Sequence, residues 1–169
     1  MIDVAVQIEP GWPTAIDWES LAAGAASTAL AASPYGWIAK RRFIAEISVR
    51  LTSDAEVRSL NKSYRGKDKP TNVLSFPMVQ PDLIDGLANS DDGEVLLGDI
   101  VLAQGVCAAE AAEKGVAIET HATHLIVHGM LHLLGYDHQG DAEGEAMEAL
   151  ERVALATLGI ADPYAVDEA

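Results

Sequence analysis

Hydrophobic and polar residues alternate along Ile2–Ile8, which predicts a strand with one buried face. Three further segments have the length of strands and are rich in apolar or β-branched residues: 43–51, 72–76 and 95–102. Pro70 and Pro77 flank the second of these segments, so we expect it at or near a sheet edge. Gly98 and Asp99 interrupt the third.

Capping signals and spaced apolar residues predict about five helices among these strands. Thr14 begins a Thr-x-x-Asp capping pattern with Asp17, and an alanine-rich helix that opens there should run to about Ala32. The other helices are expected at 53–66, 103–114, 118–135 and 141–158. Residues 78–94 hold Pro81, two glycines and five acids, which predicts a surface loop.

Two of the predicted helices are amphipathic. The helix that opens with a capping box at Ser53 should bury the stripe Val57, Leu60 and Tyr64. The last helix has its own apolar stripe, made of Met147, Leu150, Val153 and Leu158. Four strands interleaved with about five helices predict a single α/β or α+β domain over residues 1–169, with a small mixed four-stranded sheet.

The composition narrows the class of protein. A length of 169 residues with 49% hydrophobic residues suits one domain with a substantial core, and no apolar run approaches membrane-spanning length. Cys107 is the only cysteine, so no intrachain disulfide can form and we expect a cytoplasmic protein. The formal charge of −15 argues against a general nucleic-acid coat protein but allows a local basic patch.

All five histidines fall between His121 and His138, which indicates a shared role. His128 and His132 lie four positions apart, and two imidazoles on one helix face can bind a single metal ion. Gly135 can adopt a left-handed conformation and turn the chain, so that His138 becomes a third ligand. Three neutral imidazoles suit Zn²⁺ and leave a fourth position for water, so we predict one zinc ion per chain.

Further polar side chains should surround this zinc site. His121 and His124 fall on the same helix face as the two ligands, and we expect them to pack beside the site or to support it. Asp137 directly precedes the third histidine. It could orient an imidazole through a hydrogen bond or act as a general base, and we favour the orienting role.

The histidine spacing is also that of the metzincin metallopeptidases. Those enzymes carry a glutamate immediately after the first histidine, where it serves as the general base for peptide hydrolysis. Here Gly129 occupies that position, so the metal ligands are kept while the base is absent. Peptide hydrolysis is therefore an alternative hypothesis, which would need another carboxylate as the base.

Positive charge is concentrated in one segment. Four of the eleven Lys and Arg residues lie within eight positions: Lys62, Arg65, Lys67 and Lys69. Such a segment is either a solvated loop or a phosphate-binding site. Because a guanidinium can bind phosphate through two parallel hydrogen bonds, Arg65 is the candidate phosphate ligand.

Three blocks of sequence, 60–77, 97–100 and 121–138, together resemble the YbeY family of bacterial single-strand-specific endoribonucleases, which mature ribosomal RNA. Asp162-Pro163-Tyr164 adds a weaker match near the C-terminus. The resemblance implies a metal-binding helix that lies beside a cleft. It also implies that Arg65 is functionally important and that three residues bind zinc: His128, His132 and His138.

The same resemblance implies a zinc-dependent endoribonuclease that processes the 3′ end of 16S rRNA and takes part in ribosome quality control. Its partners would be single-stranded rRNA and the ribosome or small-subunit ribosomal proteins, without a membrane. Either a metal-activated water or the RNA's own 2′-hydroxyl would attack the phosphodiester, while Arg65 offsets charge on the phosphoryl oxygens. Two alternatives stay open: a metal-dependent hydrolase of another substrate, such as a metzincin-like peptidase, and a non-catalytic ribosome-assembly factor with structural zinc.

Overall fold

The computed structural model describes residues 1–89, 93–137 and 140–164. Within these ranges four strands form one sheet in the order β1-β2-β4-β3: β1 (Ile2–Ile8), β2 (Ile44–Thr52), β3 (Val73–Pro77) and β4 (Glu94–Ala103). β1, β2 and β4 are mutually parallel, and β3 runs antiparallel to β4 at the sheet edge. The predicted mixed four-stranded sheet is confirmed, as is the edge position of the proline-flanked strand.

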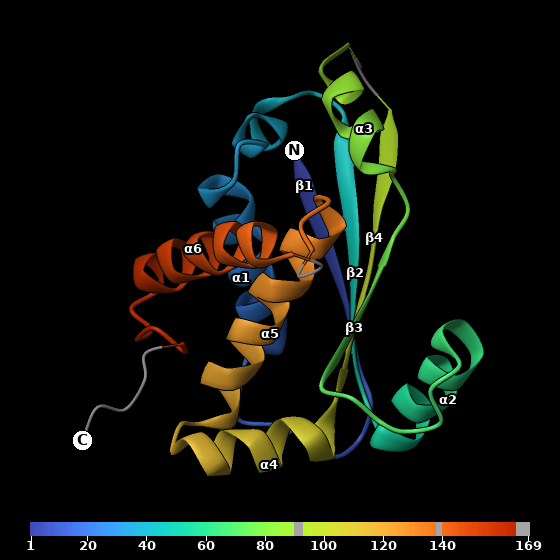
Figure 1. Ribbon diagram of the computed structural model, residues 1–169, viewed down its shortest axis with the longest axis vertical. Coiled ribbons are helices and arrows are strands. Elements are labelled where there is room, and N and C mark those ends of the chain that lie inside the picture. Colours follow the sequence, from blue (N-terminus) through green and yellow to red (C-terminus); the bar gives the residue numbers. More distant parts are fainter. Residues whose placement is uncertain (90–92, 138–139, 165–169) are drawn as a thin grey trace.

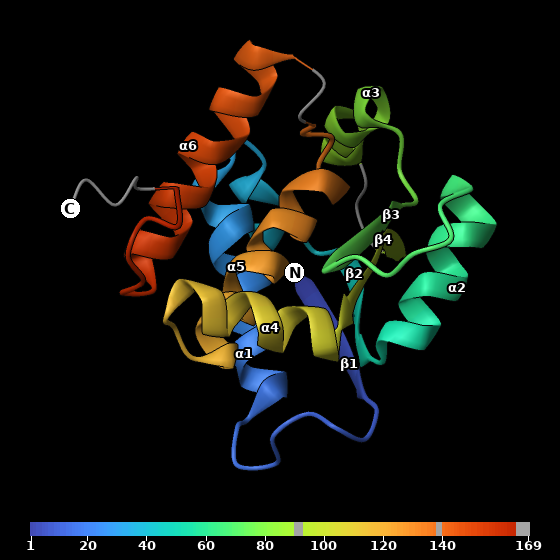
Figure 2. The same ribbon diagram turned by 60° about the horizontal axis from the view of Figure 1, so that its bottom comes forward.

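The described residues also form six α-helices: α1 (Trp18–Ala32), α2 (Asp54–Arg65), α3 (Pro81–Ile84), α4 (Gln104–Lys114), α5 (Ile118–Leu133) and α6 (Asp141–Thr157). Two 3₁₀ helices follow α1 and α3, at η1 (Gly36–Lys40) and η2 (Asp85–Asn89). α1, α5 and α6 lie on one side of the sheet, whereas α2 lies on the other (Figures 1 and 2). None of these helices is long and apolar enough to cross a membrane.

The hydrophobic core is unequal on the two sides of the sheet. A large cluster of buried side chains joins the sheet to α1 and α5, and most residues of α5 are buried. On the other side, a small cluster around Val57 and Val101 joins the sheet to α2. α5 is therefore held inside the protein, whereas α2 exposes most of its surface.

Three predicted features of the chain differ from the structure: the start of the first helix, the loop at 78–94 and the interruption of the last strand. α1 begins only at Trp18, because Asp17 is its N-cap and accepts a hydrogen bond from the backbone N–H of Ser20. Residues 78–94 are not simply a loop, since α3 and η2 form there and bury Ile84 in the main core. β4 is one continuous strand, with a register shift against β2 where Gly98 was expected to interrupt it.

The predicted stripes of α2 and α6 are also only partly right. On α2, Val57 is buried as expected, but Tyr64 is 71% exposed and Asn61 is buried instead. On α6, Met147 is buried, whereas Val153 is 55% exposed. The buried face of α6 contains these residues: Met147, Glu151, Ala154 and Leu155. Both departures have consequences for the functional site.

Candidate active site

Four histidines lie in a row along α5. Successive ring centroids, from His121 through His124 and His128 to His132, are 6.0, 6.4 and 4.6 Å apart. His121 and His124 are buried, while His128 and His132 are half-buried. The helix therefore places the predicted ligands at the more open end of the row.

His128 and His132 converge on one point. Their Nε2 atoms are 3.0 Å apart. Two nitrogens that bind one tetrahedral metal ion at about 2.0–2.1 Å would lie roughly 3.3 Å apart, so the observed separation fits a shared ion. His138 lies outside the described residues, so its role as third ligand stays a prediction. Within the ranges that the structure describes, no group of three metal-binding side chains is complete.

The turn after α5 has the expected form. Gly135 has a φ of +97°, which a glycine adopts readily, and its N–H donates to the carbonyl of His132. A Cβ at this position would lie 2.9 Å from the Cβ of Pro81, so glycine is also required by packing. The left-handed conformation predicted at Gly135 is confirmed. Asp137 follows it and is half-buried, and its orienting role stays a prediction.

Glu151 supports the histidine pair and was missed by the sequence reasoning. Its carboxylate is fully buried, and Oε1 lies 2.6 Å from Nδ1 of His128. The second oxygen, Oε2, accepts a 2.7 Å hydrogen bond from the hydroxyl of Tyr164. His124 completes the group, because its Nε2 lies 3.3 Å from the Tyr164 hydroxyl and 3.5 Å from Glu151 Oε1.

These contacts determine where the protons sit. Burial would raise the pKa of Glu151, but the hydrogen bonds from His124, His128 and Tyr164 outweigh it and lower that pKa to about 2. Burial and the adjacent Glu151 raise the pKa of Tyr164, so its hydroxyl stays protonated and donates. Because an ionised carboxylate only accepts, His128 donates from Nδ1 to Glu151, while its Nε2 faces His132.

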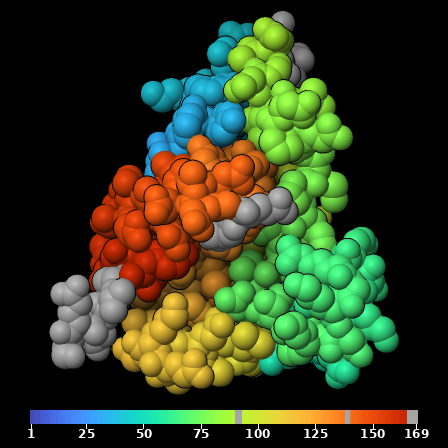
Figure 3. All heavy atoms as spheres, in the orientation of Figure 1, coloured from blue at the N-terminus to red at the C-terminus, as the bar shows by residue number. Residues whose placement is uncertain are grey.

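A second acid supports the upstream end of the row. Glu110 of α4 accepts hydrogen bonds from Nε2 of His121, at 2.8 Å, and from the side-chain amide of Asn72, at 3.0 Å. Burial lowers the pKa of His121. A cavity of about 220 Å³ separates these groups from His128 and Tyr164, and Figure 3 shows the surface hollowed between α4 (yellow) and the green segment that leads into β3. His121 and His124 are thus buried and hydrogen-bonded on the same helix face as His128, as expected of packing residues, and their support of a metal site stays a prediction.

Gly129 allows α5 to pack directly on the sheet. A Cβ at this position would lie only 2.8 Å from Cγ2 of Ile100 and 3.1 Å from Oγ of Ser75. No side chain fits there without displacing β3 or β4. The position that holds the general base of a metzincin peptidase therefore faces the sheet in this fold, which counts against peptide hydrolysis.

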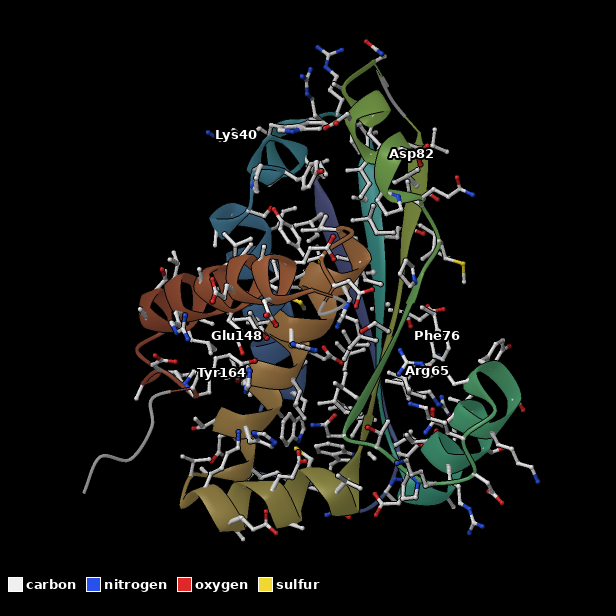
Figure 4. The ribbon with its side chains drawn as sticks, in the orientation of Figure 1. Lys40, Arg65, Phe76, Asp82, Glu148 and Tyr164 are labelled. Atoms are coloured by element: carbon white, nitrogen blue, oxygen red, sulfur yellow. The ribbon has the colours of Figure 1, made fainter. Side chains whose placement is uncertain are left out.

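Arg65 lies on the other side of β3 from this histidine cluster. It is the last residue of α2, it is exposed, and Gly66 ends the helix with a φ of +70°. Figure 4 places Arg65 between α2 and β3, near Phe76, whereas Tyr164 lies beside α6 on the α5 side. The structure thus brings His128 and His132 together, and it separates Arg65 from them by the edge strand.

Known proteins match this chain over nearly its whole length. The sequence profile described as endoribonuclease YbeY matches residues 16–159. A protein named endoribonuclease YbeY from Rhizorhabdus wittichii is 67% identical over 99% of both chains, and one of the same name from Sphingopyxis alaskensis is 59% identical over 98% of both. The chain belongs to the endoribonuclease YbeY family.

A solved structure supports the fold of this YbeY family member. The solution structure of TM1509 from Thermotoga maritima covers 97% of this chain and 100% of its own, with a TM-score of 0.54 and 21% sequence identity. At that identity the likeness concerns the fold alone. The family match spans α1 to α6, and so includes Arg65, Glu151 and the whole histidine row.

Proposed function

We propose that this protein is a metal-dependent endoribonuclease that cleaves single-stranded RNA. The observation that carries this proposal is the convergence of His128 and His132, whose Nε2 atoms are 3.0 Å apart beside a fully buried carboxylate. No Lys or Arg among the described residues pairs with Glu151, and a cation bound by the histidines would offset the cost of this buried anion. The naming of the relatives as endoribonucleases supports RNA as the substrate.

The metal in this proposal is one zinc ion per chain, held by His128, His132 and His138. Imidazole nitrogens are ligands that zinc prefers, and Glu151 fixes the tautomer of His128 that binding requires. When bound, zinc supplies Lewis acidity, which makes water more acidic and polarises a phosphoryl oxygen. Asp137 is proposed to orient an imidazole or to accept a proton.

Arg65 is proposed to bind the phosphate that reacts. Its guanidinium is exposed, and its planar fork can donate two parallel hydrogen bonds to phosphoryl oxygens as negative charge develops on them. The basic side chains at Lys62, Lys67 and Lys69 are exposed as well and lie in the same segment. An RNA strand that crosses the β3 edge could therefore contact Arg65 and the histidines at once.

The proposed cellular role is the maturation of ribosomal RNA in the cytoplasm, including the 3′ end of 16S rRNA, together with ribosome quality control. A chain with a formal charge of −15 repels RNA at long range. Small-subunit ribosomal proteins, many of them expected to be basic, would lower that barrier as partners. The competing hypothesis is a non-catalytic assembly factor in which zinc is purely structural.

The experiment compares wild type, His132→Ala and Arg65→Ala on single-stranded rRNA fragments, with Arg42→Ala as an exposed control elsewhere on the surface. We expect cleavage by wild type and Arg42→Ala, and strong loss in the other two. Metal analysis and circular dichroism should show that only His132→Ala loses zinc while both variants stay folded. Equal cleavage by all four proteins would assign the activity to a contaminant and overturn the proposal.

Analysis of the cleavage ends separates the two chemistries. If water is the nucleophile, no 2′,3′-cyclic phosphate forms. If the RNA's 2′-hydroxyl attacks, the upstream fragment ends in a 2′,3′-cyclic phosphate. Zinc bound tightly in a protein without any cleavage would instead favour the assembly factor.

A further inference from the structure

Tyr64 is an aromatic side chain in an unexpected place. At 71% exposure it is the most exposed of the large hydrophobic side chains in the described ranges, although its spacing on α2 predicts burial. Its ring is held against the edge of Phe76, with centroids 5.2 Å apart and planes at 62°. An ordered aromatic face that points into water is typical of a binding surface rather than of a core.

The two aromatic rings border a cavity of about 270 Å³ between α2 and the sheet. Its walls are largely apolar, with contributions from Leu60, Met78 and Val101. Pockets for drug-sized ligands measure roughly 300–1,000 Å³, so this one suits a single ring system rather than a longer segment.

Two polar groups lie in the floor of this cavity. Ser48, Asp99 and Phe76 are register partners on β2, β4 and β3, and their side chains therefore face the same side of the sheet. The hydroxyl of Ser48 can donate or accept, whereas the carboxylate of Asp99 only accepts. A planar ligand with an amino group on its edge would satisfy this floor, and adenine, cytosine and guanine each carry one.

Basic residues on both sides of Tyr64 in the sequence favour the binding of a negatively charged ligand. Two basic side chains in the last turn of α2 and two in the segment after it are all exposed: Lys62, Arg65, Lys67 and Lys69. Arg50, in the cavity wall, is already bound to Glu56 and to Glu9, the latter at 3.0 Å, so it does not add to this free charge. Arg65, which follows Tyr64 in the chain and lies near Phe76 (Figure 4), thus offers a cation to phosphate while the cavity offers apolar walls to a ring.

We propose that this cavity binds one unpaired nucleobase of the RNA substrate, with Tyr64 as the stacking platform. The inference rests on the proposed function and names the part of the substrate that the α2 side recognises. A base must leave its stack and its pairing partner to enter, so the cavity selects single-stranded RNA. Because β3 is the edge strand, the backbone can pass around it towards the histidines.

The test measures binding without cleavage. Short single-stranded RNAs that carry the fluorescent base 2-aminopurine are titrated with protein in the presence of EDTA. We expect fluorescence quenching on binding to wild type, and an affinity lower by roughly 5- to 100-fold for Tyr64→Leu, which matches the loss of one stacked base. Tyr64→Trp should restore binding, because it keeps an aromatic face. Leu83→Ala, which truncates a 57% exposed side chain on α3, is the matched control.

Two results would overturn the proposal. One is equal affinity of wild type and Tyr64→Leu. The other is an RNA with an abasic site at the quenched position that binds as tightly as the intact strand, which would point to a protein-docking surface instead. Cleavage is then measured separately after zinc is restored. RNA binding that depends on Tyr64, without any cleavage, would refute the proposed endoribonuclease activity but support the base-binding cavity. Cleavage without binding that depends on Tyr64 would support the activity and refute the base-binding cavity.

Discussion

The two faces of the sheet handle charge in opposite ways. On the α5 side the titratable groups are buried or half-buried and are paired, as with Glu151 and His128 at 2.6 Å and Glu110 and His121 at 2.8 Å. On the α2 side, the basic groups of α2 and of the segment after it are exposed, and the ion pair of Arg58 with Asp68 joins two side chains that are more than half exposed. One face therefore fixes protons and geometry, whereas the other presents long cationic side chains to solvent.

This difference separates two tasks. A metal ligand must be held in one tautomer and one orientation, and a hydrogen bond to a buried carboxylate achieves both. A phosphate, by contrast, arrives from water and is best met by flexible charges at the surface. Substitutions on the α5 side should therefore alter metal binding and stability, while substitutions on the α2 side should alter only the binding and cleavage of RNA.

Arg65 gives the strongest test of that separation. Removing one charge-stabilising donor typically lowers a rate by about 10²–10³-fold, so we expect a loss of that order for Arg65→Ala. Arg65→Lys should be intermediate, because lysine keeps the charge but not the planar fork. Single-turnover cleavage of single-stranded RNA measures the effect.

The same Arg65 variants should keep their zinc and their unfolding midpoint, since the side chain is exposed and outside the core. A loss of zinc in Arg65→Ala would show that the two faces are coupled. In that case the comparison between them would fail.

Glu151 is the corresponding test on the α5 side. Glu151→Gln keeps the shape but removes the charge that fixes His128, and loss of such a supporting group weakens metal affinity by about 10- to 100-fold. Competition with a chromogenic chelator measures the zinc affinity. Glu145→Gln, an exposed position on the same helix, is the control. Unchanged zinc affinity in Glu151→Gln would remove the carboxylate from the metal site.

Much of the fold could be predicted from the sequence because local patterns determine it. Alternation gives β1 with its observed bounds, and the capping box at Ser53 opens α2 as expected. The spacing of His128 and His132 on one helix face is a local property too, and so is the turn at Gly135. Each of these features depends on residues within about ten positions of one another.

The missed features depend on contacts between distant segments. An acidic residue next to an apolar stripe usually lies at the solvent-exposed edge of that stripe. The sequence pattern therefore does not predict the burial of Glu151, although it lies four positions after Met147. Its partners, His128 and Tyr164, are 23 and 13 positions away. The exposure of Tyr64 could not be predicted for a related reason. Packing on the sheet determines which face of α2 is buried, and here Asn61 is buried whereas Tyr64 is exposed. The third ligand, His138, stays a prediction.

Gly129 tests how tightly the α5 side is packed. Gly129→Ala places a methyl group 2.8 Å from Ile100, and overpacking of this kind destabilises by about 1–3 kcal/mol. Urea unfolding should show this loss. Gly24→Ala on α1 is the matched control, because a Cβ there has no neighbour within 4 Å. That control should stabilise the helix by about 0.5–1 kcal/mol, and equal effects of the two substitutions would contradict close packing at Gly129.

Tyr164 should give the smallest effect, because it acts on the metal ligand through Glu151. Tyr164→Phe removes the hydroxyl that donates to Oε2 of Glu151 at 2.7 Å, and the loss of one net hydrogen bond destabilises by about 1 kcal/mol. Zinc affinity should fall by less than in Glu151→Gln, since the contact of Glu151 with His128 is kept.

Tyr35→Phe is the control for this last comparison, because Tyr35 is half-buried and its hydroxyl has no hydrogen-bond partner within the described part of the chain. Unfolding and zinc competition should leave Tyr35→Phe at the wild-type values. If Tyr164→Phe weakens zinc binding more than Glu151→Gln does, the hydroxyl orients His124 or the ion directly. The order of action from Tyr164 through Glu151 to His128 would then be wrong.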